Sequence, residues 1–211
     1  MPLYKIIRLG HHPGVLEKEA LLTWQAAMIT LTIFFAQLFL VLEILPSTTL
    51  KSDTIHSISD FLILFGATLV ATYAIRASGS NGRTAKKWFA YAGIGILILG
   101  AISVFSEALE RLDNPVSIKN EWLMVVGFIG GLGNFWAYKV LSKIPRHEQS
   151  HSHKVANLHV LCDMGLSGIV VISGLTGWLF GWVRADAVLS LIAAPAMISI
   201  AVVLFLEILD D

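Results

Sequence analysis

The sequence predicts an all-α membrane protein with six transmembrane helices and both termini in the cytoplasm. Of its 211 residues, 55% are hydrophobic and only 14% are charged, which is less charge than the surface of a soluble domain usually carries. The apolar residues lie in long runs, each close to the ~20 residues that an α-helix needs to cross a bilayer. Short segments rich in Gly, Pro, Ser, Asn and Asp separate these runs and are typical of turns.

The predicted helices follow one another along the chain with short connections. Their ranges are 21–45, 53–76, 88–110, 118–141, 156–180 and 185–208. Pro46 ends the first helix because proline lacks a backbone N–H and does not fit inside a helix. Residues 78–82, 113–115 and 181–184 contain the Gly, Asn and Pro that favour turns between later helices. No connection is long enough to hold a second domain.

The domain division follows from these ranges. We expect residues 1–20 to form a cytoplasmic N-terminal segment and residues 21–209 to form one six-helix transmembrane domain. The sequence ends at Asp211, soon after the sixth helix, so no C-terminal soluble domain is expected. The first residues lack an apolar stretch followed by a small-residue cleavage site, so no removable signal peptide is predicted.

The distribution of Lys and Arg predicts the orientation. Eleven of the 15 Lys and Arg lie on the side that holds the N-terminus and the loops after the second and fourth helices. Because Lys and Arg are enriched in cytoplasmic loops, this side is predicted to be cytoplasmic. The eleven are Lys5, Arg8, Lys18, Arg76, Arg83, Lys86, Lys87, Lys139, Lys143, Arg146 and Lys154.

Composition also excludes some classes of protein. The formal net charge is zero, so no nucleic-acid partner is predicted. The single cysteine, Cys162, excludes an internal disulfide. No sequence feature points to a prosthetic group, and the expected partners are the lipid bilayer and small ions.

Two predicted helices carry the same pair of polar residues where lipid would surround the chain. The second helix contains His56 and Asp60, and the fifth contains His159 and Asp163. In each pair the two residues are four apart, so they lie on one face of the helix. Ionisable residues inside a span are costly, at least ~2.5 kcal/mol for an acid, and are usually functional.

The two pairs are predicted to lie at a similar depth. Asp60 and Asp163 each lie roughly 10 Å along a helix from opposite membrane faces, since each residue adds 1.5 Å. In a hydrocarbon core of ~30 Å, both carboxylates are then within about 5 Å of the middle. Antiparallel neighbouring helices would bring two imidazoles and two carboxylates together.

Two His and two Asp suit a tetrahedral Zn²⁺ site. Imidazole also binds other transition metals, so Cd²⁺, Co²⁺, Fe²⁺ and Mn²⁺ are alternative ions. The competing interpretation is that each polar side chain is only a hydrogen-bond partner between helices. Two copies of His-x-x-x-Asp at matching depth favour the metal site. Cys162 lies at a different angle on the fifth helix and is predicted to pack instead of binding metal.

These motifs resemble the cation diffusion facilitator family of metal transporters. The resemblance extends from about Ser52 to the C-terminus, and the first helix matches weakly. The segments that carry it are 52–60, 106–112 with 114–116, Asn134, 158–167 and 181–190.

The resemblance implies that the protein exchanges a cytoplasmic divalent metal for protons. Carried over residue by residue, the transport site would be His56, Asp60, His159 and Asp163, and a His in both pairs is similar to the zinc-preferring members. Family members usually continue into a soluble cytoplasmic domain that binds metal and dimerises. This sequence ends before such a domain, so both a homodimer and a monomer remain open. The loop at Arg83 also lacks the His that the family often has there.

Several alternatives remain open from the sequence. The motifs of metalloproteases and of serine hydrolases with a nucleophile elbow are absent from the sequence, so a secondary transporter is favoured over an intramembrane enzyme. A metal sensor or accessory subunit without flux, and a channel, are further alternatives. His147, His151 and His153 in the fourth loop could gather metal or be idle. The expected location is a cell membrane, by analogy a prokaryotic inner membrane.

Overall fold

The computed structural model describes the backbone of residues 13–43, 48–77, 80–114 and 120–210, and the side chains of residues 14–39, 58–77, 80–114, 121 and 124–210. Within these residues the chain forms six α-helices, which confirms the predicted fold class. They are α2 (Pro13–Glu43), α3 (Thr48–Arg76), α4 (Ser80–Asp113), α5 (Asn120–Leu141), α6 (His151–Phe180) and α7 (Ala185–Leu209).

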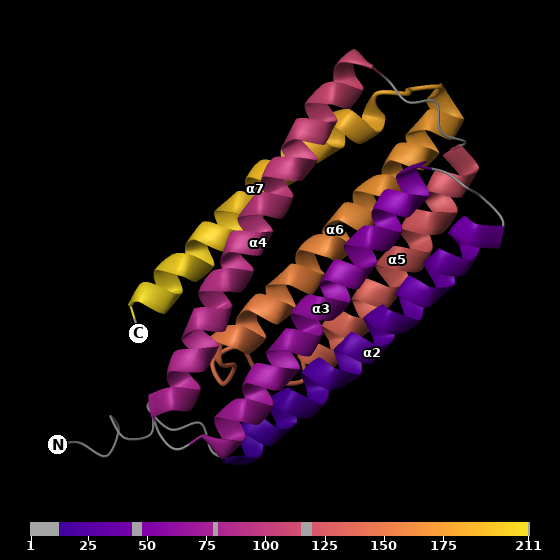
Figure 1. The fold of residues 1–211 in the computed structure, drawn as a ribbon. Coiled ribbons are helices and arrows are strands. Elements are labelled where there is room, and N and C mark those ends of the chain that lie inside the picture. Colours follow the sequence, from indigo (N-terminus) through magenta and orange to yellow (C-terminus); the bar gives the residue numbers. More distant parts are fainter. Residues whose placement is uncertain (1–12, 44–47, 78–79, 115–119, 211) are drawn as a thin grey trace.

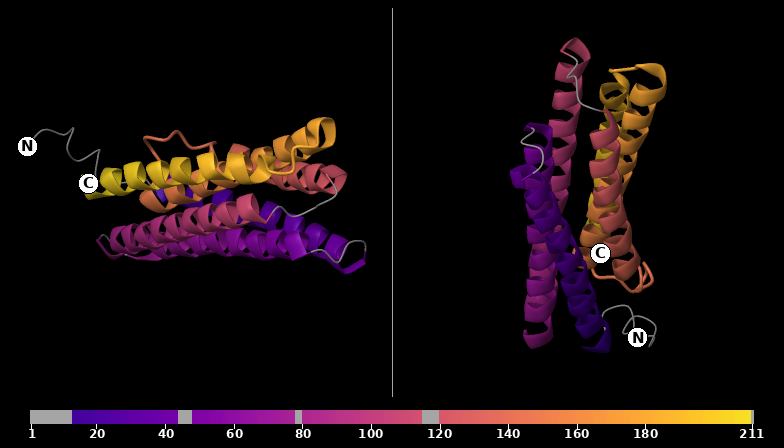
Figure 2. Two further views of the ribbon diagram at one scale, coloured as in Figure 1. Left: turned by 90° about the horizontal axis from the view of Figure 1, so that it is seen from above. Right: turned by 90° about the vertical axis from the view of Figure 1, so that its right-hand side faces the viewer.

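The six helices run up and down and form one bundle (Figure 1). The closest pairs are α2 with α3, α5 with α6, and α4 with α7. The first two pairs also pack against each other, because α2 contacts α5 and α3 contacts α6. The α4–α7 pair lies to one side of these four helices and reaches them through α3 and α6 (Figures 1 and 2). The helix α2 begins at the end of the bundle where α7 ends.

The surface of the bundle is apolar, as expected for contact with lipid. Each of the six described helices is long and apolar enough to span a membrane. Large hydrophobic side chains such as Leu99, Phe128 and Ile192 are more than half exposed, and exposed apolar area of this kind is stable in a bilayer but not in water. The interior holds many alanines together with leucine, isoleucine and several polar residues, and the small alanines let helices approach closely.

Four helices begin earlier than the sequence predicts. The helices α2, α3, α4 and α6 begin at Pro13, Thr48, Ser80 and His151, five to eight residues before the first residue of each predicted range. The prediction followed hydrophobicity, which shows where lipid contact begins and not where the helical backbone begins. A proline at the start of α2 fits this position, because the first helical residues have no intrahelical partner for their N–H groups. At the other end of α6, Gly181 adopts a left-handed conformation (φ 64°) and its N–H donates to the carbonyl of Gly177.

Glycines on α5 allow its neighbours to approach closely. A Cβ atom on Gly127 would lie 2.8 Å from Val170 Cγ1 on α6, and one on Gly133 would lie 2.5 Å from Ile33 Cγ1 on α2. A real Cβ does not tolerate such contacts, so α5 fits between α2 and α6 only because these positions lack a side chain. The glycines of α5 therefore serve packing within the chain.

Replacing Gly133 is expected to destabilise the bundle. Gly133→Val would place its Cβ against Ile33 Cγ1 and force the α2–α5 contact apart, at an expected cost of about 1–3 kcal/mol for overpacking. The measurement is unfolding in detergent followed by circular dichroism. Gly168→Val is the matched control, since no atom lies within 4 Å of a Cβ built there; equal unfolding midpoints for the two variants would contradict the packing argument.

Candidate metal centre

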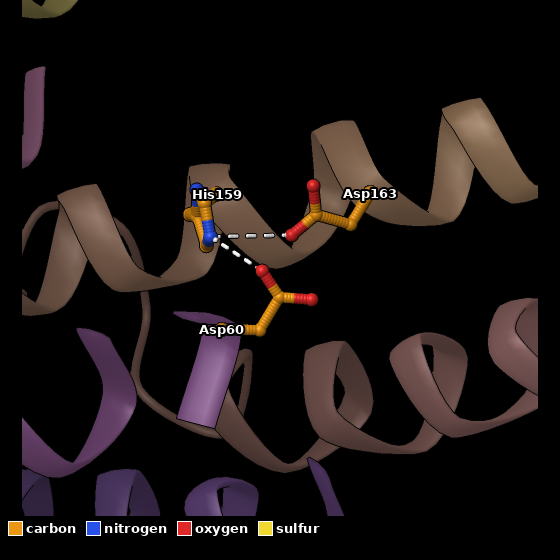
Figure 3. A group of neighbouring side chains, drawn as sticks. All are labelled: Asp60, His159 and Asp163. Atoms are coloured by element: carbon orange, nitrogen blue, oxygen red, sulfur yellow. Dashed lines mark hydrogen bonds and ion pairs between the residues drawn. The ribbon is translucent and has the colours of Figure 1, made fainter. Parts of the chain in front are cut away.

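Three of the four residues predicted to bind metal lie together between α3 and α6 (Figure 3). Asp60 projects from α3, and His159 and Asp163 project from α6, one helical turn apart. The Nε2 atom of His159 lies 3.1 Å from Asp60 Oδ1 and 3.4 Å from Asp163 Oδ2. One ligand atom from each residue lies within 4.8 Å of the other two. The expected juxtaposition of the second and fifth predicted helices is therefore present.

All three side chains are buried. Asp60 is 4% exposed, His159 5% and Asp163 3%. Two carboxylates this close to each other in an apolar interior repel, and each loses the hydration that stabilises its charge. A positive group between them removes both penalties, and a protonated imidazole or a divalent cation would meet this need. The three side chains are therefore residues that could hold a cation at their centre.

The geometry makes protons and metal compete for one atom. His159 Nε2 faces both carboxylates, so a proton on this nitrogen would interact with them. A metal ion needs the lone pair of the same nitrogen, since ligands bind in their deprotonated form. One imidazole and two carboxylates supply ligands of the kind that zinc accepts.

His56 is the fourth residue of the predicted site, and its side chain lies outside the described residues. Its backbone belongs to α3, one turn before Asp60. Residues four apart lie on the same face of a helix, so the spacing assigns His56 to the helix face that carries Asp60. That His56 completes the site stays a prediction.

Cys162 lies beside the site residues in sequence but not among them. Its side chain is buried with Ala101 of α4 and Met197 of α7. This position confirms that the cysteine packs in the core and does not join the cluster with Asp163.

The histidines of the fourth loop do not form one group. The side chain of His147 is 81% exposed and lies 3.6 Å from Glu148 Oε1. In contrast, His153 is 1% exposed, and its Nε2 lies 2.9 Å from the carbonyl oxygen of Leu141. The α6 helix begins at His151, which turns His153 into the bundle. His153 therefore belongs to the buried part of α6 and not to an exposed loop, while metal binding by this tract stays an open alternative.

Two of the sequence motifs meet at the other end of the bundle. Arg111, at the end of α4, forms ion pairs with Glu107 on its own helix and with Asp186 in the first turn of α7. The Glu107 pair follows the four-residue spacing on one helix face. The Asp186 pair joins α4 to α7 where the motifs 106–112 and 181–190 come together.

The sequence did not reveal a second polar cluster inside the bundle. Glu19 of α2 is 1% exposed and forms an ion pair of 2.7 Å with Lys86 of α4, which is 4% exposed. Glu19 falls in the range predicted to be a cytoplasmic segment, and Lys86 was counted among the eleven Lys and Arg of the predicted cytoplasmic side. No local pattern indicates their pairing, because the two residues are far apart in sequence and meet only through tertiary packing.

Comparisons with known proteins show which family this chain is similar to. The family model "Cation efflux transmembrane domain" matches residues 23–211. A cadmium, cobalt and zinc/H(+)-K(+) antiporter of Bacillus subtilis is 28% identical over 152 residues, which is 70% of this chain and 49% of that protein. The zinc transporter ZitB of Escherichia coli is 26% identical over 155 residues, 70% of this chain and 48% of the relative.

A third relative comes from yeast. Zinc homeostasis factor 1 of Schizosaccharomyces pombe is 34% identical over 119 residues, covering 51% of this chain and 29% of that protein. The chain spans about half the length of the two bacterial relatives. The family model matches most of the chain, and the described helices are six apolar helices with a buried Asp-His-Asp group among them. The chain therefore belongs to the cation efflux family and matches the transmembrane domain of that family.

Proposed function

We propose that this protein carries a divalent metal ion, zinc first, across the membrane in exchange for protons. The metal is the transported substrate. The residues that bind it near the middle of the membrane are His56, Asp60, His159 and Asp163. The observation that carries the proposal is the convergence of Asp60 from α3 with His159 and Asp163 from α6 in a buried position. The names of the two bacterial relatives support zinc as the transported ion. One relative is named as a cadmium, cobalt and zinc antiporter and the other as a zinc transporter.

Proton coupling follows from the shared ligand atom. A metal that arrives displaces the proton on His159 Nε2, and a proton that arrives weakens the hold on the metal. An unperturbed imidazole titrates near pH 6.5, so an acidic compartment would favour release. The Bacillus subtilis relative is named as an antiporter that uses H(+), which supports exchange over simple conduction.

The proposed direction is efflux from the cytoplasm. It rests on the excess of Lys and Arg at the end of the bundle where α2 begins and α7 ends. With this end in the cytoplasm, both termini are cytoplasmic. A tag on either terminus tests this orientation when intact cells are treated with a membrane-impermeant reagent that reacts with the tag. Reaction of the tag in intact cells would overturn the proposed orientation.

Flux in proteoliposomes tests the function. Purified protein is reconstituted, a pH gradient is imposed, and uptake of zinc, cadmium, cobalt, iron and manganese is followed with a trapped indicator. We expect saturable zinc uptake that depends on the gradient and moves protons the opposite way. Zinc binding without flux would show a sensor or accessory subunit instead, and flux without proton movement would show a channel.

A further inference from the structure

The Glu19–Lys86 ion pair lies at the end of the bundle where α6 begins. Glu19 Oε2 lies 2.7 Å from Lys86 Nζ. The same carboxylate accepts two further hydrogen bonds from Ser150, one from the backbone N–H to Oε1 at 2.6 Å and one from the hydroxyl to Oε2 at 2.8 Å. One buried carboxylate thus joins α2, α4 and the residue that precedes α6. We call Glu19, Lys86 and Ser150 the latch.

The latch is buried on every side. Its three residues are at most 5% exposed, and the hydroxyl of Ser152, 3.2 Å from that of Ser150, extends the network along α6. Replacing a buried ion pair by apolar residues is often neutral or stabilising, so such a pair is weak evidence for stability and better evidence for a role in selecting one arrangement. Because all the bonds converge on one carboxylate, a movement of the Glu19 side chain away from Lys86 and Ser150 would break all of them.

The chain is tightly packed between the latch and the metal cluster. Ser150 precedes His159 by about two and a half turns of α6, roughly 13 Å at 1.5 Å per residue. Val155 and Ala156, which lie between them, are fully buried. A Cβ on Gly93 would lie 2.4 Å from Val155 Cγ1, so the backbone of α4 contacts α6 at this level. On the other side, Thr68 of α3 donates a hydrogen bond of 3.0 Å to Thr23 of α2.

We propose that the latch is the gate that closes this end of the bundle to metal. It holds α2 and α4 against the start of α6, and the arrangement in the structure is the form closed at this end. Metal reaches Asp60, His159 and Asp163 from this side only after Glu19 releases Lys86 and Ser150. This inference rests on the proposed function, since a gate has meaning only for a transported ion.

A buried cysteine probe tests the gate. Cys162→Ala removes the only native thiol, and Ala156→Cys places a new one between the latch and His159. A charged, membrane-impermeant thiol reagent is applied from each side of oriented vesicles without metal. The latch is then removed by Glu19→Gln with Lys86→Gln, which takes away both charges and leaves no buried charge unpaired.

We expect the double variant to label about tenfold faster from the α6 N-terminal side, because the equilibrium shifts toward the form open at that end. Labelling from the opposite side should not rise. Zinc flux should fall, since the carrier no longer closes after loading. Ser150→Ala removes only the hydrogen bonds of the hydroxyl group, so it should raise the labelling rate from the same side by a smaller factor. This variant replaces the double variant in the test if the double variant does not fold.

Arg146→Gln is the matched control. Its side chain is 63% exposed and lies 3.4 Å from Glu207, so it removes an ion pair at the same end without touching the latch, and labelling should stay at the starting rate. A latch variant with a lower unfolding temperature but an unchanged labelling rate would overturn the gate. It would show that the latch only stabilises the packing of the helices. Labelling requires no transport, so absence of zinc flux in the unaltered protein would sink the proposed function while the labelling rates still decide the gate.

Discussion

Asp60→Asn and Asp163→Asn are each expected to reduce zinc flux by at least about two orders of magnitude, because each removes one charged ligand from a site that needs them to offset the dehydration of the ion. Asparagine keeps the size and shape of the side chain, so both variants should fold. Initial rates of zinc uptake in proteoliposomes are the measurement, with circular dichroism to verify the helical content.

Asp113→Asn is the control for the loss of an acid. This residue lies exposed at the end of α4, far along the chain from either ligand pair, and its replacement should leave the rate unchanged. Zinc uptake at the normal rate in Asp60→Asn or Asp163→Asn would contradict a role for these carboxylates in holding the transported ion.

His159→Asp is expected to change the choice of metal. The substitution exchanges the nitrogen that faces both carboxylates for oxygen, and oxygen ligands favour manganese relative to zinc compared with imidazole. The ratio of zinc to manganese uptake should fall by about tenfold, which is about 1.4 kcal/mol of relative affinity. Competition between the two ions in one uptake assay measures the ratio directly.

His147→Asp makes the same exchange outside the site. The side chain of His147 is 81% exposed, so the ratio of the two metals should not change in this variant. If His159→Asp retained the original ratio while both variants fold, imidazole at this position would not determine the selectivity.

The sequence predicted the six helices because lipid imposes a simple requirement. Each span must be apolar over about 20 residues and must satisfy its backbone internally, so hydrophobic runs identify helices almost alone. The predicted beginnings of α2, α3, α4 and α6 were wrong for the same reason. Once the helix leaves the hydrocarbon, its sequence no longer has to be apolar, and hydrophobicity does not indicate that Pro13, Ser80 or His151 already belong to a helix.

The cluster of Asp60, His159 and Asp163 could be predicted because a polar residue inside a span is rare. Spacing placed each His and Asp on one helix face, and the similar depth indicated that the two faces meet. The structure brings three of the residues together, while their binding of metal and the part of His56 stay predictions.

The latch shows what spacing cannot reveal. Glu19, Lys86 and Ser150 each lie near the end of a helix, where a charged or polar residue is ordinary. Their burial depends on how α2, α4 and α6 pack against one another, and no periodic pattern within one helix carries that information. His153 is a similar case, since its ring turns toward Leu141 only because α6 begins at His151.

The most direct measurement is the position of zinc bound to the protein, determined from anomalous scattering at the zinc absorption edge in crystals grown with the metal. We predict one peak enclosed by Asp60, His159 and Asp163, at about 2.0–2.2 Å from one carboxylate oxygen of each Asp and from His159 Nε2. Zinc found instead only at surface histidines such as His147, with the three buried side chains still bonded to one another, would contradict the proposal that this cluster holds the transported ion.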